Sequence, residues 1–320
     1  MKLSRLLRYG MAGKDIKHLQ IRLGELKYAD YLATGNFGPK TLKSVKKFQN
    51  DNGLSVDGVV GNKTWTYLFS GTIKPNNNEP IRVTPRKKFS LKPDEITPNG
   101  LEIFEQIMPD GEYVKKKTKK KIIYLHHTAG SHRPDWVIAS WGRDRDKNGK
   151  PIRVATHYVI GRRSNGGDTT WDGKVFRAYD DNHWAWHLKA GNSKLDSESI
   201  AIEICNYGWA KKLDNGQFIN WVGSEIPASE IVDLGEEFRD HRYYQKYTNE
   251  QIESLRKLII YLTEKHDIDI EHGIYNKNWF GYDSTYLEPG QRGLRTHVHV
   301  RKNKSDCFPQ NELIDMLNSL

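Results

Sequence analysis

Histidine and cysteine residues stand at positions in this 320-residue chain where they could bind a metal ion together. His126 and His127 are adjacent, and a second cluster near the C-terminus holds His297, His299 and Cys307. Two imidazoles and one thiolate supply three corners of a tetrahedral zinc site and leave the fourth corner to water. Because structural zinc sites are closed, this donor set predicts a catalytic zinc that generates hydroxide near neutral pH.

Two predicted strands would carry these ligands. The apolar run Ile122–Leu125 predicts a buried strand that delivers the first histidine pair to its end. Successive strand residues point to opposite faces, so only one histidine of that pair can face the metal. The alternation Thr296–Val300 predicts a second strand whose two histidines share a face, so that either could be a ligand, followed by a polar loop that returns with Cys307.

Two further elements complete the predicted scaffold. Glu203 lies inside the apolar alternation Ser199–Ile204, and a carboxylate is costly to bury there unless it is paired or belongs to a site. Thr248 and Gln251 form the pattern of a helix capping box, and the apolar residues after them repeat at helical spacing. We therefore expect a strand that carries Glu203 and a helix of about 16 residues packed on the sheet.

Five motifs in order resemble the zinc-dependent N-acetylmuramoyl-L-alanine amidases of type 2, whose fold phage lysins and peptidoglycan recognition proteins share. The motifs are His126–Gly130, His157–Ile160, Ala185–His187, Ser199–Ile204, and Thr296-His297 with Cys307. The resemblance implies an α/β catalytic domain with a mixed central sheet flanked by helices and a zinc site at strand ends. It implies one Zn²⁺ per chain, bound by His126, His297 and Cys307, with His299 as the alternative to His297. The implied activity is hydrolysis of the amide between N-acetylmuramic acid and L-alanine in bacterial peptidoglycan.

The resemblance also implies roles for residues around the metal. Glu203 corresponds to the family's general base, which moves a proton from zinc-bound water to the leaving amine. Relatives often carry an oxyanion-stabilising lysine two residues before the last ligand, but Ser305 occupies that position here. Lys304 lies three residues before Cys307 and is the candidate, with another group as the alternative. The candidate substrate-binding residues are His157, Trp186, His187 and Asn192.

The first third of the chain resembles a second family. Residues 6–70 contain two similar glycine turns, Asn36–Thr41 and Val59–Thr64, each followed by a helix-like stretch, and an earlier helix starts near Asp15. These motifs, with Gly13–Gln20 and the Asp57-Gly58 turn, resemble the peptidoglycan-binding domain type 1 family. The periodicity predicts three short helices around a small core, and the resemblance implies docking to the bacterial cell wall.

Prolines separate the two regions. The stretch Thr72–Gly100 contains five prolines and no sustained period, which predicts a semi-rigid linker. The predicted domains are a peptidoglycan-binding domain at 1–71, a proline-rich linker at 72–100 and a zinc amidase catalytic domain at 101–320. Segments Trp209–Tyr247 and Glu271–Arg292 look like insertions that line a glycan groove or form surface loops.

The net charge of +10 lies mostly in the first third, where residues 1–74 carry 13 Lys and Arg against 5 Asp and Glu. Such an excess of positive charge favours association with polyanions, which include nucleic acid, anionic wall polymers and membrane surfaces. No zinc finger, helix-turn-helix or RNA-recognition motif accompanies this charge. We therefore expect bacterial peptidoglycan as the partner and no nucleic acid.

Composition also bears on where the protein acts. No apolar run approaches the ~20 residues of a membrane helix, and the N-terminus lacks the apolar stretch of ~7–15 residues of a secretory signal. Cys205 and Cys307 cannot make a disulfide framework, and Cys205 is expected to be a small buried residue. We expect a protein made in the cytoplasm without a signal peptide that acts on the cell wall as a phage endolysin, with a particle-borne or bacterial enzyme as the alternative origin. The alternative function is a non-catalytic peptidoglycan-recognition protein on the same scaffold; a monomer is favoured.

Overall fold

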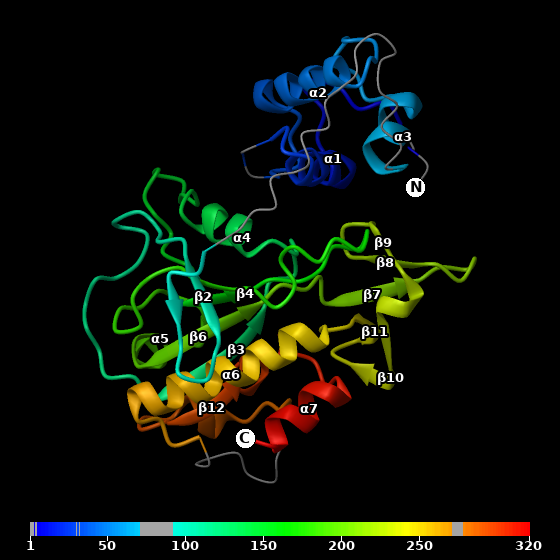
Figure 1. Ribbon diagram of the computed structural model, residues 1–320. Helices are drawn as coiled ribbons and strands as arrows, with labels where there is room; N and C mark the ends of the chain where they lie inside the picture. Colours follow the sequence, from blue (N-terminus) through cyan, green and yellow to red (C-terminus); the bar gives the residue numbers. More distant parts are fainter. Residues whose placement is uncertain (1–2, 4, 30, 32, 71–91, 271–277) are drawn as a thin grey trace. The chain divides into compact units, whose positions relative to one another are not determined.

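The computed structural model describes residues 3, 5–29, 31, 33–70, 92–270 and 278–320 (Figure 1). The chain divides into two compact units, residues 1–90 with 222–225 and residues 91–221 with 226–320. The described part of residues 1–90 is helical, and the strands of the two described sheets lie between residues 95 and 296.

Three short helices build the N-terminal unit, as the sequence predicts. They are α1 (Lys14–Glu25), α2 (Pro39–Asp51) and α3 (Asn62–Ser70). Pro39 occupies the first turn of α2, where its missing N–H costs no hydrogen bond. One apolar core joins the three helices, and its helical members include Ile16, Leu19, Leu23, Val45, Phe48, Trp65 and Leu68.

A seven-stranded mixed sheet forms the centre of the second unit, in the order β1-β2-β5-β4-β6-β3-β12. Its strands are β1 (Glu95–Ile96), β2 (Glu102–Glu105), β3 (Ile122–His127), β4 (Tyr158–Ile160), β5 (Val175–Arg177), β6 (Ser199–Ile204) and β12 (Gly293–Thr296). β4, β6, β3 and β12 run parallel as neighbours, and every residue of β3 is buried. The buried strand predicted at the first histidine pair and the strand that carries Glu203 are both confirmed.

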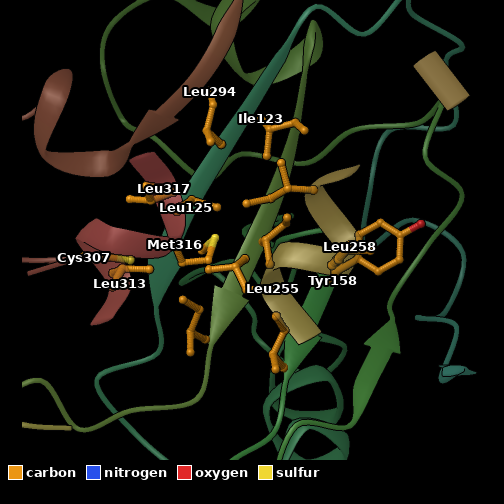
Figure 2. Close-up of a cluster of buried hydrophobic side chains, with 14 of the residues drawn as sticks. Ile123, Leu125, Tyr158, Leu255, Leu258, Leu294, Cys307, Leu313, Met316 and Leu317 are labelled. Carbon is orange, nitrogen blue, oxygen red and sulfur yellow. The ribbon is translucent and has the colours of Figure 1, made fainter. Parts of the chain in front are cut away.

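Helices cover both faces of this sheet. On one face, α6 (Asn249–His266) and α7 (Asn311–Asn318) pack against Ile123 and Leu125 of β3 (Figure 2). α4 (Pro134–Trp141) belongs to a separate buried cluster with Val159 of β4, while Leu195 of the short α5 (Ser193–Ser197) packs with Tyr124. The predicted capping box of α6 is present, since Thr248 accepts from Gln251 N and Gln251 accepts from Thr248 N. Within the described ranges, no helix combines the length and the apolar character needed to cross a bilayer.

The predicted insertion at 209–247 is a second sheet. Its five strands follow the order β10-β11-β7-β8-β9. They are β7 (Trp209–Lys212), β8 (Phe218–Asn220), β9 (Glu225–Ile226), β10 (Ile231–Phe238) and β11 (His241–Gln245). A buried ion pair between Arg162 Nη2 and Glu230 Oε2, 2.6 Å long, ties this segment to the end of β4.

The predicted linker is too long at its C-terminal end. Residues 71–91 lie outside the described residues, but β1 falls within the predicted linker and pairs antiparallel with β2. The turn between them contains Pro98 and Gly100, whose φ of +77° suits glycine, and Thr97 Oγ1 accepts from Leu101 N. A two-residue strand carries no periodicity, so the sequence does not distinguish this turn from a linker. The predicted insertion 271–292 lies partly outside the described residues, at 271–277.

Candidate active site

Strand pairing brings the predicted site residues to one edge of the central sheet. β3 and β6 are parallel neighbours, and His126 is the register partner of Glu203. Residues in register on adjacent strands point to the same face, so these two side chains share one side of the sheet. β12 pairs parallel with β3 and ends at Thr296, which brings His297 to the same edge.

Two histidines and an aspartate converge there. The Nδ1 atoms of His126 and His297 lie 3.0 Å apart. Oδ2 of Asp306 lies 3.3 Å from His126 Nδ1 and 2.8 Å from His297 Nδ1, and all three residues are buried. Across the described parts of the chain, this is the group of three or more His, Cys, Asp or Glu residues whose ligand atoms lie close enough to share a metal ion.

The donor set fits zinc. His297 Nε2 lies 3.0 Å from the carbonyl oxygen of Leu188, which can only accept, so Nε2 carries the proton and Nδ1 of the neutral ring carries a lone pair. Burial, and then the neighbouring His297, lower the pKa of His126 to about 4, which leaves that ring neutral near pH 7. Asp306 completes the set with a carboxylate oxygen, Oδ2, that faces both Nδ1 atoms. The separations of 2.8–3.3 Å are close to the edge of about 3.3 Å of a tetrahedron with zinc bonds of about 2.0–2.1 Å.

The third group beside the histidines is Asp306, not Cys307 as predicted. Cys307 is completely buried in the hydrophobic core, where Figure 2 shows it with Leu313 and Met316. Adjacent residues point to opposite sides here, so the side chain that faces the histidines belongs to Asp306.

The same division separates His127 from the metal group. His127 Nδ1 lies 2.9 Å from the hydroxyl of Tyr247, on the side of the sheet that α6 and α7 cover. Its other nitrogen lies against Gly208, where an added Cβ would come within 2.8 Å of Nε2. The expectation that only one histidine of the pair can face the metal agrees with this geometry.

His299 is also placed apart, and the predicted strand 296–300 is wrong. β12 ends at Thr296 and the chain turns through a 3-10 helix at His297–His299. His299 Nδ1 accepts from Thr296 N at 3.0 Å, and Nε2 lies 2.9 Å from the carbonyl oxygen of Asn278. Both ring nitrogens therefore have backbone partners, and His299 acts as a cap on the turn that presents His297.

Glu203 and Lys304 lie near the metal group. Glu203 is partly buried, and desolvation, followed by the charge of Asp306, raises its pKa to about 8, while the Lys304 ammonium opposes that shift. The same ammonium acts on His126. Lys304 stands two residues before Asp306, which is the spacing that the resemblance implies for the lysine before the last ligand.

His187 is buried rather than exposed to a cleft. Its Nδ1 lies 3.0 Å from His126 Nε2, and its Nε2 lies 2.8 Å from Ser199 Oγ. The neighbouring Trp186 is 37% exposed and packs edge-on against Trp184, with ring centroids 5.0 Å apart. Only Trp186 of this predicted substrate-binding segment therefore presents a large accessible surface.

The structure gives His157 and Asn192 structural partners. His157 is fully buried; its Nδ1 accepts from Ala201 N and its Nε2 donates to the carbonyl oxygen of His183, both at 3.0 Å. Asn192 caps α5 by accepting from Lys194 N and donates to Leu287 O. A buried ring with two backbone partners cannot contact substrate, so the prediction for His157 is corrected to a scaffold role.

An aromatic stack holds the segment that carries Asp306. Phe308 is fully buried between Tyr244 and Tyr247, with ring centroids 4.4 and 4.5 Å away and interplanar angles of 24° and 14°. Tyr244 belongs to β11 of the second sheet. The second sheet thus supports the segment that carries Asp306 from the core side.

Sequence reasoning missed Asp306, although the residue lies in the cluster that it singled out. The available signal was the lysine spacing, because Lys304 fits the family pattern when Asp306 is the last ligand. Cys307 was preferred since a thiolate is a common zinc ligand.

Two family comparisons match consecutive parts of the chain. The sequence model described as N-acetylmuramoyl-L-alanine amidase matches residues 116–306. A second model, described as a peptidoglycan binding domain, matches residues 12–68. Together they cover the candidate site, the five strands of the central sheet from β3 onward, and most of the three-helix unit.

Individual relatives share shorter or more distant similarity. A curated protein of Kitasatospora aureofaciens, named "Uncharacterized protein in bpoA1 3'region", is 47% identical over 58 residues, which span 18% of this chain and about half (49%) of that relative. The solved SleB N-terminal domain is 31% identical, covering 22% of this chain and 97% of that one, with a TM-score of 0.22. The catalytic domain of XlyA is 13% identical, covering 68% and 96%, with a TM-score of 0.37.

Proposed function

The chain belongs to the N-acetylmuramoyl-L-alanine amidase family, and from this membership we propose that it is a zinc-dependent peptidoglycan amidase. The proposed reaction is hydrolysis of the amide that joins the lactyl group of N-acetylmuramic acid to L-alanine. The observation that carries the proposal is the convergence of His126, His297 and Asp306 beside Glu203 within the matched region.

His126, His297 and Asp306 would hold one Zn²⁺ and leave one coordination position open. Zinc bound in this way supplies an acidic water molecule and polarises the amide carbonyl. The site is buried around these three side chains, which strengthens electrostatic interactions in it.

Glu203 is the proposed general base. It lies on the strand next to His126, on the same face, where a carboxylate can accept a proton from water and return it to a leaving group. In the proposed sequence it takes a proton from water and passes it to the nitrogen of L-alanine as the amide bond breaks.

Lys304 is the proposed oxyanion stabiliser. Its ammonium acts electrostatically on both Glu203 and His126, so a positive charge lies near the reacting carbonyl. Trp186, with its exposed ring, is a proposed contact for substrate outside the metal centre.

The N-terminal unit is proposed to bind the cell wall, as its family match suggests. Anchoring the enzyme on an insoluble substrate raises the local substrate concentration without changing the chemistry. We further propose an endolysin role for the whole chain, in keeping with the sequence expectation.

Mass analysis of fragments from purified peptidoglycan tests the proposal directly. The zinc-loaded protein should release stem peptides with a free L-alanine amino group, and a chelator should stop the release. Glu203→Gln should retain one zinc per chain and lose about 100-fold or more of the activity. Wall binding without any amide cleavage by the zinc-loaded protein would instead identify a recognition protein, and cleavage at another bond would refute the proposed substrate bond.

A further inference from the structure

The two histidines of the candidate metal group share a supporting segment. His126 Nε2 lies 3.0 Å from His187 Nδ1, and His297 Nε2 lies 3.0 Å from the carbonyl oxygen of Leu188. In each of these two metal-side histidines, Nδ1 faces the candidate metal position and Nε2 contacts one of two consecutive residues, His187 or Leu188. We call His187-Leu188 the supporting dipeptide.

The hydrogen bonds that link Ser199, His187 and His126 each have a definite donor and acceptor. The Ser199 hydroxyl donates to the carbonyl oxygen of Asp196 at 3.2 Å, so its oxygen accepts from His187 Nε2 at 2.8 Å. A neutral His187 with its proton on Nε2 has a bare Nδ1, which can only accept. His126 must then donate from Nε2, which leaves the lone pair of its Nδ1 directed at His297 and Asp306.

The supporting dipeptide is itself fixed in place. One buried oxygen, Oδ1 of Asp196, accepts from the backbone N–H groups of both His187 and Leu188, at 2.8 and 3.0 Å. This carboxylate thereby fixes the backbone of both residues that contact the two histidines.

We infer that His187 is a positioning residue that, with Ser199, sets the tautomer and orientation of His126 for zinc binding. The inference rests on the proposed function, because it concerns the same metal. It assigns His187 a role other than substrate contact: it orients one ligand, while Leu188 orients the other. Metal-bound histidines commonly donate their second ring N–H in this way, and loss of the acceptor weakens metal binding or activity about 10–100-fold.

Zinc affinity of full-length variants, measured by competition with a chromogenic chelator, tests the inference. His187→Phe keeps a buried ring but removes the acceptor, and we expect its zinc dissociation constant to rise about 10–100-fold. His187→Asn places a carbonyl oxygen near the position of Nδ1 and should restore most of the affinity. Ser199→Ala removes only the outer partner and should give a smaller loss.

Tyr158→Phe is the matched control. It deletes a different buried hydrogen bond, from the Tyr158 hydroxyl to Asp181, and contacts none of the metal-side histidines. We expect it to lower the free energy of unfolding without changing zinc affinity. The absorption spectrum of the cobalt(II)-substituted protein should change in His187→Phe and not in the control.

The outcomes distinguish this inference from the proposed function. Wild-type zinc affinity and an unchanged cobalt spectrum in His187→Phe would overturn the positioning role while leaving the amidase proposal intact. Equal losses in His187→Phe and His187→Asn would also overturn it, since the acceptor would then not matter. A wild-type protein that binds no zinc would overturn both.

Discussion

Single replacements of Asp306 and Cys307 separate the two candidate third ligands. The sequence pattern favours the cysteine, whereas the structure places the aspartate 2.8 Å from His297 and the cysteine in the core. We expect Cys307→Ala to retain one zinc per chain and Asp306→Ala to lose it at micromolar zinc. The two residues are adjacent, so local disturbance of the backbone affects both variants alike.

The expected magnitudes follow from the two environments. Four-ligand structural zinc sites bind with about 10–16 kcal/mol, or roughly 3–4 kcal/mol for each ligand. Loss of Asp306 should therefore weaken zinc binding by about 10²–10³-fold. Cys307→Ala removes one buried sulfur atom and should cost about 1–2 kcal/mol of stability, with zinc affinity within a factor of about three of wild type.

Equilibrium dialysis followed by metal analysis gives the zinc content, and urea unfolding in chelator gives the stability of the metal-free chain. Asp306→Asn serves as a control for shape, because it keeps the side-chain outline and removes the charge. If Cys307→Ala lost zinc while Asp306→Ala kept it, the argument from side-chain direction would be wrong and the cysteine would be the ligand.

Three further perturbations probe the scaffold around the site. In metal-free protein, the pKa of Glu203 is raised to about 8, so its contribution to stability is complete below about pH 4.5 and is lost as the pH rises through about 8. This loss amounts to up to a few kcal/mol of the free energy of unfolding. Glu203→Gln should remove the loss, which urea unfolding across this pH range would measure. Gly208→Ala would bring a Cβ within 2.8 Å of His127 at a φ of +77°, and we expect thermal unfolding to show a cost of about 1–3 kcal/mol; wild-type stability would contradict the close contact. Thr248→Ala should lower stability by about 1–2 kcal/mol through loss of the α6 cap, and zinc content should not change; a loss of zinc would show that α6 supports the metal group more directly.

The sequence carried enough signal to predict the elements that hold the histidines. A continuous apolar run specifies β3 because a strand buried on both faces needs no polar alternation, and Thr248 with Gln251 specifies the start of α6. The alternation at 296–300 wrongly predicts a strand. Alternating valines and histidines also suit a buried 3-10 turn in which the side chain of His299 caps the turn. Strand periodicity alone cannot tell these two cases apart.

Identifying Asp306 as the proposed third ligand depends on information that local sequence does not hold. Within a strand, alternation decides which of His126 and His127 faces the site, but Asp306 and Cys307 lie in a loop where no period applies. Their directions are set by distant contacts, chiefly the placement of Phe308 between Tyr244 and Tyr247. Likewise, nothing in the Trp-His segment indicates that His187 contacts His126 rather than substrate.

The aromatic stack at Phe308 has a consequence for how this enzyme can be re-engineered. In the sequence, the second sheet at 209–245 looks like an insertion that could be exchanged without touching the site. Yet one ring of the stack comes from that sheet, and the ring it presses on lies two residues from Asp306. A chimera that keeps the proposed zinc ligands and the proposed general base but swaps this segment would still have to supply an aromatic surface at Tyr244.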